Sequence, residues 1–414
     1  MVRFVSTRGS APARSLTDAI AKGLAPDGGL YVPEAMPRAD LVSLRSAKTL
    51  AERATALLTP WFEGDTLAPS LSSICEAAFT FDAPLVSLGD DSVLELFHGP
   101  TAAFKDFGAR FLAETLSRAG ADGTVLVATS GDTGAAVAAA FAGRPGFKVV
   151  VLYPDGRVSP RQAHQLGAFG DNVRALRVAG SFDDCQALVK RAFADEALTK
   201  QHRLRSANSI SLGRLLPQMA YHAHAAMQLP GASFVVPTGN LGNAQACLWA
   251  RAMGLPIDRV VLATNANRVI VDLVNEGLWS PGPSRSTLAN AMDVGAPSNV
   301  ERLRVMYTDA QLSGAVSAES VDDDAIRKTI VETWRDHHYA LCPHTACAVA
   351  VRRHQSGGPW VIVATAHPAK FESIVEPLVG AEIAAPAALA ELLARPSHAD
   401  PLPADYDAFV SALQ

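Results

Sequence analysis

One lysine lies in a run of aromatic and small residues, FHGPTAAFKDFGARF, at residues 97 to 111. Burial of a lysine disfavours its charged form and lowers its pKa, and the neutral amine is a nucleophile. Lys105 could therefore form a Schiff base with an aldehyde or with pyridoxal phosphate. The alternative is a lysine on an amphipathic helix whose charged end reaches water, and for this run taken alone that commoner arrangement is favoured.

Two short loops rich in glycine, hydroxyl and amide groups could bind anions. SGDTGAA (130–136) follows a predicted strand and begins a helix, and TGNLGNA (238–244) does the same after a later strand. Backbone N–H groups at a helix N-terminus attract an anion. The glycines of the second loop would let its backbone approach a phosphate, and Asn240 and Asn243 would add side-chain donors. For either loop alone, the alternative is a helix cap whose glycines allow tight packing.

The two loops and the lysine together are more specific than any one of them. Neither loop is a nucleotide-binding fingerprint, because the second lacks the full G-x-G-x-x-G spacing and neither ends in G-K-[ST]. Pyridoxal phosphate, however, requires a lysine for the imine, one loop for its own phosphate and a second loop for a substrate carboxylate. The combination favours a reactive Lys105 over a solvated one.

Composition sets the limits within which such a site must be built. The chain has 414 residues, of which 49% are hydrophobic and 19% charged, and a net charge of -5. This length favours two or three domains with a sizeable core. The acidic balance argues against nucleic acid as a partner. We see no signal peptide and no run of about 20 apolar residues, so we expect a cytoplasmic protein without a membrane span. Five scattered cysteines indicate reduced thiols.

Strands and helices alternate after about residue 85, which predicts parallel sheets with helical crossovers. Strands are predicted at 124–129, 149–154, 174–178, 204–209, 233–238, 260–265 and 360–366. Helices are predicted from Gly131, Ser159 and Asn243 and over 183–195, 268–276, 322–339 and 344–355, with an ordered loop at 280–300. The fold class is therefore α/β, with two parallel-sheet lobes whose strand ends surround one cleft.

The predicted domain limits follow from this change of pattern. Residues 1–85 form a mostly helical N-terminal extension broken by turns, and 86–228 form an α/β lobe that carries Lys105 and the first loop. Residues 229–380 form a second α/β lobe with the second loop, and 381–414 a peripheral helix or tail.

Several stretches, in the same order, resemble those of the threonine synthase family, which has the fold-type II pyridoxal-phosphate fold related to the tryptophan synthase β subunit. They are STRG (6–9), GLAPDGGLYVPE (23–34), FHGPTAAFKDFG (97–108), SGDTG (130–134), SANSIS (206–211), TLANAMDVGAPSN (287–299), PHTA (343–346) and TAHPAKF (365–371). The resemblance covers nearly the whole chain, and the lysine motif and TAHPAKF are its most specific parts.

The resemblance implies conversion of O-phospho-L-homoserine and water to L-threonine and phosphate. It implies that Lys105 holds pyridoxal 5'-phosphate and moves protons between substrate carbons, and that Thr365 meets the pyridine nitrogen with its hydroxyl. The cofactor phosphate would lie against a loop that has Thr238 where the family more often has serine and Leu241 where it more often has phenylalanine. The loop's cofactor-binding residues would be Gly239, Asn240, Leu241, Gly242 and Asn243.

The substrate's two anionic groups are assigned to further residues by the same resemblance. Its carboxylate would be bound by Ser130, Gly131, Asp132 and Thr133, with the side chain of Asp132 facing away from the anion or capping the helix. Its phosphate needs cations or strong donors, for which the candidates are Ser159, Arg161, Asn208, Ser209 and Arg214. For any single arginine the alternative is an ordinary surface ion pair.

Other interpretations stay open. A threonine synthase-like phospholyase or β-replacement enzyme could use the same cofactor on another phosphorylated or sulfonated amino acid, since motifs for the cofactor do not fix the substrate. A non-catalytic protein that keeps the fold would have no need of Lys105. The trio Cys342, His344 and Cys347 has no second pair of ligands nearby, so a packed helix N-terminus is favoured over a metal site. The protein is expected to be a monomer or homodimer.

Overall fold

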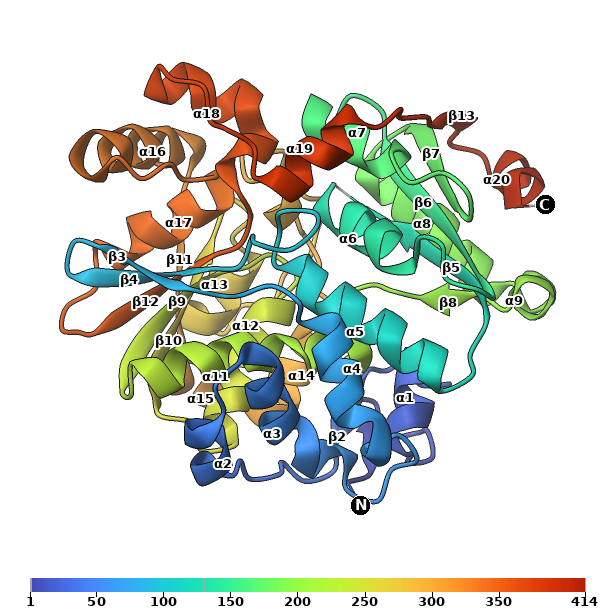
Figure 1. The fold of residues 1–414 in the computed structure, drawn as a ribbon, viewed down its shortest axis with the longest axis horizontal. Helices are drawn as coiled ribbons and strands as arrows, with labels where there is room; N and C mark the ends of the chain where they lie inside the picture. The colour runs from blue at the N-terminus through green and yellow to red at the C-terminus, as the bar shows by residue number, and fades with distance from the viewer. Residues whose placement is uncertain (1, 130, 414) are drawn as a thin grey trace.

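The computed structural model describes residues 2–129 and 131–413 (Figure 1). Two larger sheets and one two-stranded sheet organise the chain. In the part of the chain that is described, no helix is both long enough and apolar enough to cross a membrane. The α/β class with parallel sheets, expected from the alternating pattern, is confirmed.

The five-stranded sheet is parallel throughout and has the order β13-β7-β6-β5-β8. Its strands are β5 (Gly123–Ala128), β6 (Phe147–Pro154), β7 (Val173–Ala179), β8 (Arg205–Ser206) and β13 (Asp400–Pro403). The crossovers contain α6 (Asp132–Phe141), α7 (Pro160–Gly167), α8 (Phe182–Ala194) and α9 (Glu196–His202). The strand predicted at 204–209 is only two residues long, since its polar residues beyond Ser206 enter the site.

The six-stranded sheet has the order β11-β10-β9-β12-β4-β3. Its strands are β3 (Leu85–Leu88), β4 (Asp91–Glu95), β9 (Ala232–Pro237), β10 (Ile257–Thr264), β11 (Ser317–Ser320) and β12 (Trp360–Ala364). All neighbours are parallel except β3 and β4, an antiparallel hairpin at the edge. The associated helices are α11 (Gln218–Gln228), α12 (Gly242–Ala252), α13 (Val269–Glu276), α14 (Val300–Met306), α15 (Asp309–Ala315), α16 (Asp323–His337) and α17 (Pro343–Arg352).

The strands alternate between two packed faces, as a sheet buried on both sides requires. In the five-stranded sheet, Val125 and Val127 pack with α6 in one core, whereas Leu126 packs with α8 in another. In the six-stranded sheet, Val361 packs on the α12 side and Ile362 on the α17 side.

The N-terminal part is mostly helical, as predicted, and lies at the bottom of Figure 1. It contains β1 (Phe4–Ser6), paired antiparallel with β2 (Tyr31–Pro33), and α1 (Leu16–Lys22), α2 (Leu41–Ser46), α3 (Leu50–Phe62), η1 (Ala68–Ser70) and α4 (Leu71–Ala78). Capping residues fix its helix starts: Asp40 accepts from two backbone N–H groups, and Thr49 and Glu52 form a capping box. α5 (Lys105–Arg118), packed on α4 and α6, joins this part to the two lobes.

The C-terminal part is not only a peripheral helix or tail. After η3 (Pro368–Phe371) and α18 (Glu372–Val379), the chain forms α19 (Ala387–Ala394), β13 and α20 (Tyr406–Leu413). β13 adds a parallel strand to β7 of the five-stranded sheet, so the end of the chain returns from one sheet to the other. The hairpin of β3 and β4 likewise joins the six-stranded sheet, although it precedes Lys105 in sequence. The domain limits drawn from the sequence stay a prediction.

Candidate active site

Lys105 and Thr365 come together because the strands before them are neighbours. β4 and β12 are parallel, so the segments that follow them leave the sheet at the same edge. There Ala103 forms an antiparallel bridge with Ala366, and the Phe104 N–H donates to the Thr365 carbonyl over 2.8 Å. The two most specific sequence motifs therefore meet at the first residue of α5.

The side chain of Lys105 is 13% exposed and lines a cavity. Burial lowers its pKa to about 8; the carboxylate of Asp132 opposes this shift, and the positive charges of Lys370 and Arg214 add to it. The amine therefore exchanges between its charged and neutral forms close to neutral pH. This is the environment that the apolar run around Lys105 predicts.

The N-terminus of α12 offers a row of backbone donors. The chain enters the helix through Leu241, which is in the left-handed conformation at φ 62°. Within the described residues, no protein acceptor meets the backbone N–H groups of residues 239 to 244. A Cβ on Gly239 would lie 2.7 Å from the Cα of Met292, so only glycine fits between the loop and this neighbouring backbone. Such a bare helix N-terminus is suited to a phosphate.

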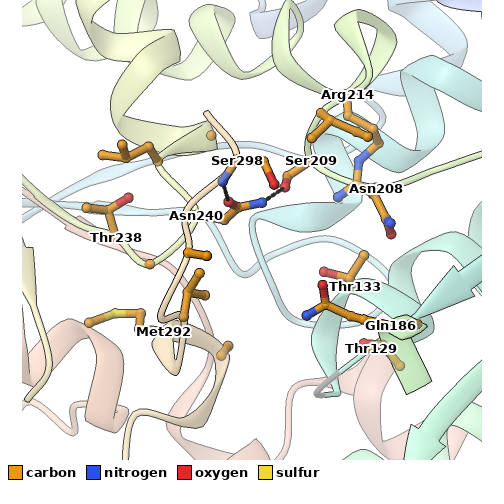
Figure 2. Close-up of a pocket in the computed structure, with 18 of the residues that line it drawn as sticks. Thr129, Thr133, Gln186, Asn208, Ser209, Arg214, Thr238, Asn240, Met292 and Ser298 are labelled. Carbon is orange, nitrogen blue, oxygen red and sulfur yellow. Dashed lines mark hydrogen bonds between the residues drawn. The ribbon is translucent and has the colours of Figure 1, made fainter. Parts of the chain in front are cut away.

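The two asparagines of this loop, Asn240 and Asn243, differ in their use, and Figure 2 shows the two hydrogen bonds of Asn240. The amide of Asn240 donates to Ser209 Oγ over 2.6 Å, and its Oδ1 accepts from the Ser298 N–H over 2.6 Å. Asn240 therefore ties the loop to its neighbours. Asn243 Oδ1 accepts from Tyr221 over 2.9 Å, while its Nδ2 is buried without a partner among the described residues. The sequence predicted that both asparagines would offer a side-chain donor to a phosphate. Of the two, only Asn243 has a buried amide nitrogen without a partner among the described residues.

The cavity has a volume of about 540 Å³ and lies between the strand ends of the two larger sheets. It is lined by most of the predicted site residues: Lys105, Asp132, Thr133, Asn208, Ser209, Arg214, Gly239, Asn240, Leu241, Gly242, Asn243 and Thr365. Gly131 is buried but does not line it. Ser130 lies outside the described residues.

Asp132 does not cap α6, and its side chain is turned towards two lysines. It is the first residue of α6, and its buried carboxylate lies 2.9 Å from Lys370 Nζ and 3.9 Å from Lys105 Nζ. Burial opposes its ionisation, but the two lysines, Lys370 foremost, hold the pKa of the carboxyl well below its usual range. The expected capping role was wrong because the buried cation beside Asp132 was not recognised, and the orientation of this side chain relative to the substrate carboxylate stays a prediction.

Arg214 and Asn208 line the same side of the cavity as Thr133 (Figure 2). The guanidinium of Arg214 is buried, Nη1 donates to the Ala207 carbonyl, and Nε has no partner among the described residues. Burial lowers its pKa to about 10, so it remains a cation at neutral pH. An unpartnered buried cation beside a cavity is a binding group for an anion.

Ser159 and Arg161 are not brought to the cavity. Ser159 Oγ donates to the Lys370 carbonyl over 2.7 Å and caps α7, and Arg161 Nη1 donates to the Ala369 carbonyl over 2.7 Å. Arg161 also lies near the carboxylates of Glu372 and Glu376. Predicted as ligands of a substrate phosphate, both residues are instead used to bind the turn η3.

Sequence reasoning assigned no role in the active site to Lys370 or His344, although both lie in motifs that it singled out, TAHPAKF and PHTA. His344 lines the cavity; its Nε2 accepts from the Ala291 N–H over 3.1 Å, and burial lowers its pKa to about 4, so it is neutral. Cys342 accepts from the Thr345 N–H and caps α17, which is the packed helix start expected there. Gln186 and Lys190 of α8, which also line the cavity, had no signal beyond helical periodicity.

These residues fit pyridoxal phosphate. The bare N-terminus of α12 suits its phosphate, the amine of Lys105 its aldehyde, and the hydroxyl of Thr365 its ring nitrogen. The chain matches the family description "Pyridoxal-phosphate dependent enzyme" over residues 93–366. The fold and the site therefore define a pyridoxal-phosphate-dependent enzyme of fold-type II.

Further comparisons narrow this class. The chain matches "Threonine synthase N terminus" over residues 3–79 and "Threonine synthase, C-terminal" over 345–412. It is 40% identical over 408 residues to threonine synthase from Escherichia coli (strain K12), covering 95% of each chain. The crystal structure of threonine synthase from Escherichia coli superposes with a TM-score of 0.93 at 38% identity, covering 99% of both chains. That of PLP-bound threonine synthase from Brucella melitensis gives 0.91 at 36%, covering 100% of this chain and 99% of the other.

The chain belongs to the threonine synthase family. It is a lyase that depends on pyridoxal phosphate.

Proposed function

We propose that this enzyme converts O-phospho-L-homoserine and water to L-threonine and phosphate. The observation that carries the proposal is one cavity, lined by Lys105, that has two separate anion sites: the bare N-terminus of α12 and the buried guanidinium of Arg214. A cofactor phosphate and a substrate phosphate need two such sites. The relatives named above, all called threonine synthase, support the choice of reaction.

Pyridoxal phosphate, when bound, supplies an electron sink that stabilises negative charge on the substrate's carbons. Its phosphate would be held by the backbone of residues 239–243, its ring nitrogen by Thr365, and its aldehyde carbon by Lys105. The amine of Lys105, with a pKa of about 8, can take a proton from one substrate carbon and return it to another near neutral pH.

The substrate would lie between α6 and α10 (Leu212–Leu215). Its carboxylate fits the backbone N–H groups of Asp132 and Thr133, which have no acceptor among the described residues. Its phosphate fits Arg214 and Asn208, both on the cavity wall. Ser209, whose hydroxyl already accepts from Asn240, would act through the position of the loop. The sequence-predicted roles of Ser159 and Arg161 are not carried into this proposal.

The proposal is tested by adding O-phospho-L-homoserine to the purified enzyme and measuring phosphate and threonine together. Equal release of both is expected, and Lys105→Ala is expected to abolish both while the fold, followed by circular dichroism, is kept. Phosphate release without threonine would replace the proposal by the phospholyase alternative. If neither phosphate nor threonine is released, O-phospho-L-homoserine is not the substrate of either reaction.

We further propose that the enzyme works in the cytoplasm as a monomer or homodimer. The reduced state of its cysteines agrees with such a compartment, since all five are free and buried. Sedimentation of the purified holoenzyme would test the oligomeric state, and a larger assembly would contradict it.

A further inference from the structure

A second buried lysine lies next to Lys105 and has no assigned role. The side chain of Lys370, in η3, is 0% exposed. Its ammonium donates to the Thr101 carbonyl over 2.6 Å and lies 2.9 Å from Asp132 Oδ1. A buried cation is costly unless a close carboxylate and further hydrogen bonds compensate it. The pair of Lys370 and Asp132 meets both conditions.

Asp132 is shared unequally between the two lysines. Its Oδ1 is bound by Lys370 and also accepts from Gln162 Nε2 over 2.9 Å. Its Oδ2 lies 3.9 Å from Lys105 Nζ, which is beyond hydrogen-bond distance. The amine of Lys105 thus lies near a carboxylate without being directly bonded to it.

The position of Asp132 between the two lysines is fixed by contacts between the lobe of the five-stranded sheet and the lobe of the six-stranded sheet. η3 follows β12 of the six-stranded sheet, whereas α6 and α7 belong to the five-stranded sheet. Ser159 and Arg161 at the start of α7 hold the carbonyls of Lys370 and Ala369, and Gln162 of the same helix holds Asp132. Asp132 cannot move towards Lys105 without breaking its bonds to Lys370 and Gln162.

We propose that Lys370 is a positioning residue for the reaction: by holding Asp132 it denies Lys105 a close ion-pair partner, and so keeps the Lys105 amine free to bond the cofactor and to carry protons. The inference deepens the proposed function of the same site. Besides Asp132 and Lys370, the titratable groups that face Lys105 are Arg214 on α10 and His344 on α17, and His344 is neutral.

The charges around Lys105 determine the direction in which its pKa should move in each variant. Loss of the ammonium of Lys370 would remove a positive neighbour and release Asp132 towards Lys105, and both changes raise the pKa of Lys105. Loss of the carboxylate of Asp132 would remove the attraction and lower that pKa further. A residue that only supported the fold would not produce opposite shifts from the two substitutions.

The test measures Lys105 in the cofactor-free full-length protein. An amine-selective acylating reagent labels only the neutral amine, and peptide mass spectrometry reports the labelling of Lys105 against pH. We expect the labelling midpoint to rise by roughly one pH unit in Lys370→Met, which is about tenfold slower labelling at pH 7. The midpoint should fall in Asp132→Asn and stay close to that of the original protein in Lys370→Arg, which keeps a cation.

Unchanged midpoints in folded Lys370→Met and Asp132→Asn would overturn the proposal, as would shifts in the same direction. If Lys370→Met does not fold, Lys370→Gln takes its place, because the amide can still donate to Thr101 and Asp132 without a charge. An upward shift is expected there too, and an unchanged midpoint again overturns the proposal. Because labelling needs no substrate, a failure of the proposed reaction would leave this result intact, and the two failures are distinguishable.

Discussion

Two helix N-termini face the cavity, and they differ in how many of their backbone N–H groups are left open. α6 and α12 both follow a parallel strand and a loop with glycines, and they look alike in sequence. At α12, the backbone N–H groups of residues 239 to 244 have no acceptor among the described residues. At α6, the hydroxyl of Thr129 accepts from the N–H groups of Gly131 and Gly134, and the carboxylate of Asp132 provides a negative charge.

The difference shows that a helix dipole can serve a site in two ways. An N-terminus whose first residue is glycine, as at Gly242, presents bare donors to a ligand's phosphate. An N-terminus whose first residue is an aspartate stabilises that aspartate's charge, which here binds a buried lysine. The α12 end therefore offers donors alone, whereas the α6 end combines the two open N–H groups proposed for the substrate carboxylate with a fixed charge beside Lys105.

The largest effect should come from breaking the ion pair at α6. Asp132→Asn leaves the ammonium of Lys370 buried without a charged partner, which should lower the free energy of unfolding by about 3–5 kcal/mol. Urea denaturation of the cofactor-free protein measures this quantity. The matched variant is Asp132→Asn combined with Lys370→Met, which removes both charges and should be more stable than Asp132→Asn alone. A double variant whose loss equals the sum of the two single losses would contradict the pairing.

A smaller effect is expected from filling the open end at α12. A Cβ on Gly239 would meet the backbone of Met292 at 2.7 Å, so Gly239→Ala should displace the loop. Overpacking of this kind costs about 2 kcal/mol, or roughly thirtyfold in cofactor affinity. The visible absorbance of bound pyridoxal phosphate during dialysis measures retention. Gly242→Ala is the control, because its Cβ would meet Ser209 Cβ only at 3.5 Å, and it should retain the cofactor better.

Most of the parallel strands were predictable because each is a local apolar run between turns. The hairpin of β3 and β4 and the late strand β13 were not, since their existence depends on partners far away in sequence, β12 and β7. The pairing of β4 with β12 also explains how two motifs some 260 residues apart in the printed sequence meet at Lys105. No local pattern contains that information.

The same limit of sequence-based prediction, that long-range partners are not visible locally, applies to single side chains of the site. Residue type and position predicted Lys105 and the loop at 239–243, because an apolar setting and glycines at a helix start act locally. Ser159 and Arg161 had suitable types, but which acceptor they meet is set by η3, which comes from the other lobe. Lys370 was overlooked for the converse reason: the short motif TAHPAKF gives no sign that its lysine will be completely buried.

The smallest effect on stability should come from removing the hydroxyl of Thr129, which accepts from two backbone N–H groups at the start of α6. Thr129 Oγ1 accepts from Gly131 N–H over 3.0 Å and from Gly134 N–H over 2.9 Å, and the residue is buried. Thr129→Val keeps the shape but leaves these donors without that acceptor, so the free energy of unfolding should fall by about 1 kcal/mol. Thr129→Ser, which keeps the hydroxyl, should lose less in the same urea titration.

The same substitution sharpens the comparison of the two helix ends. If the hydroxyl of Thr129 is what closes α6, Thr129→Val exposes additional donors there, and inorganic phosphate should protect the cofactor-free variant against urea more than it protects Thr129→Ser. Equal protection of the two variants would mean that the carboxylate of Asp132 alone decides which helix end receives phosphate, because a fixed negative charge repels phosphate whatever donors lie beside it.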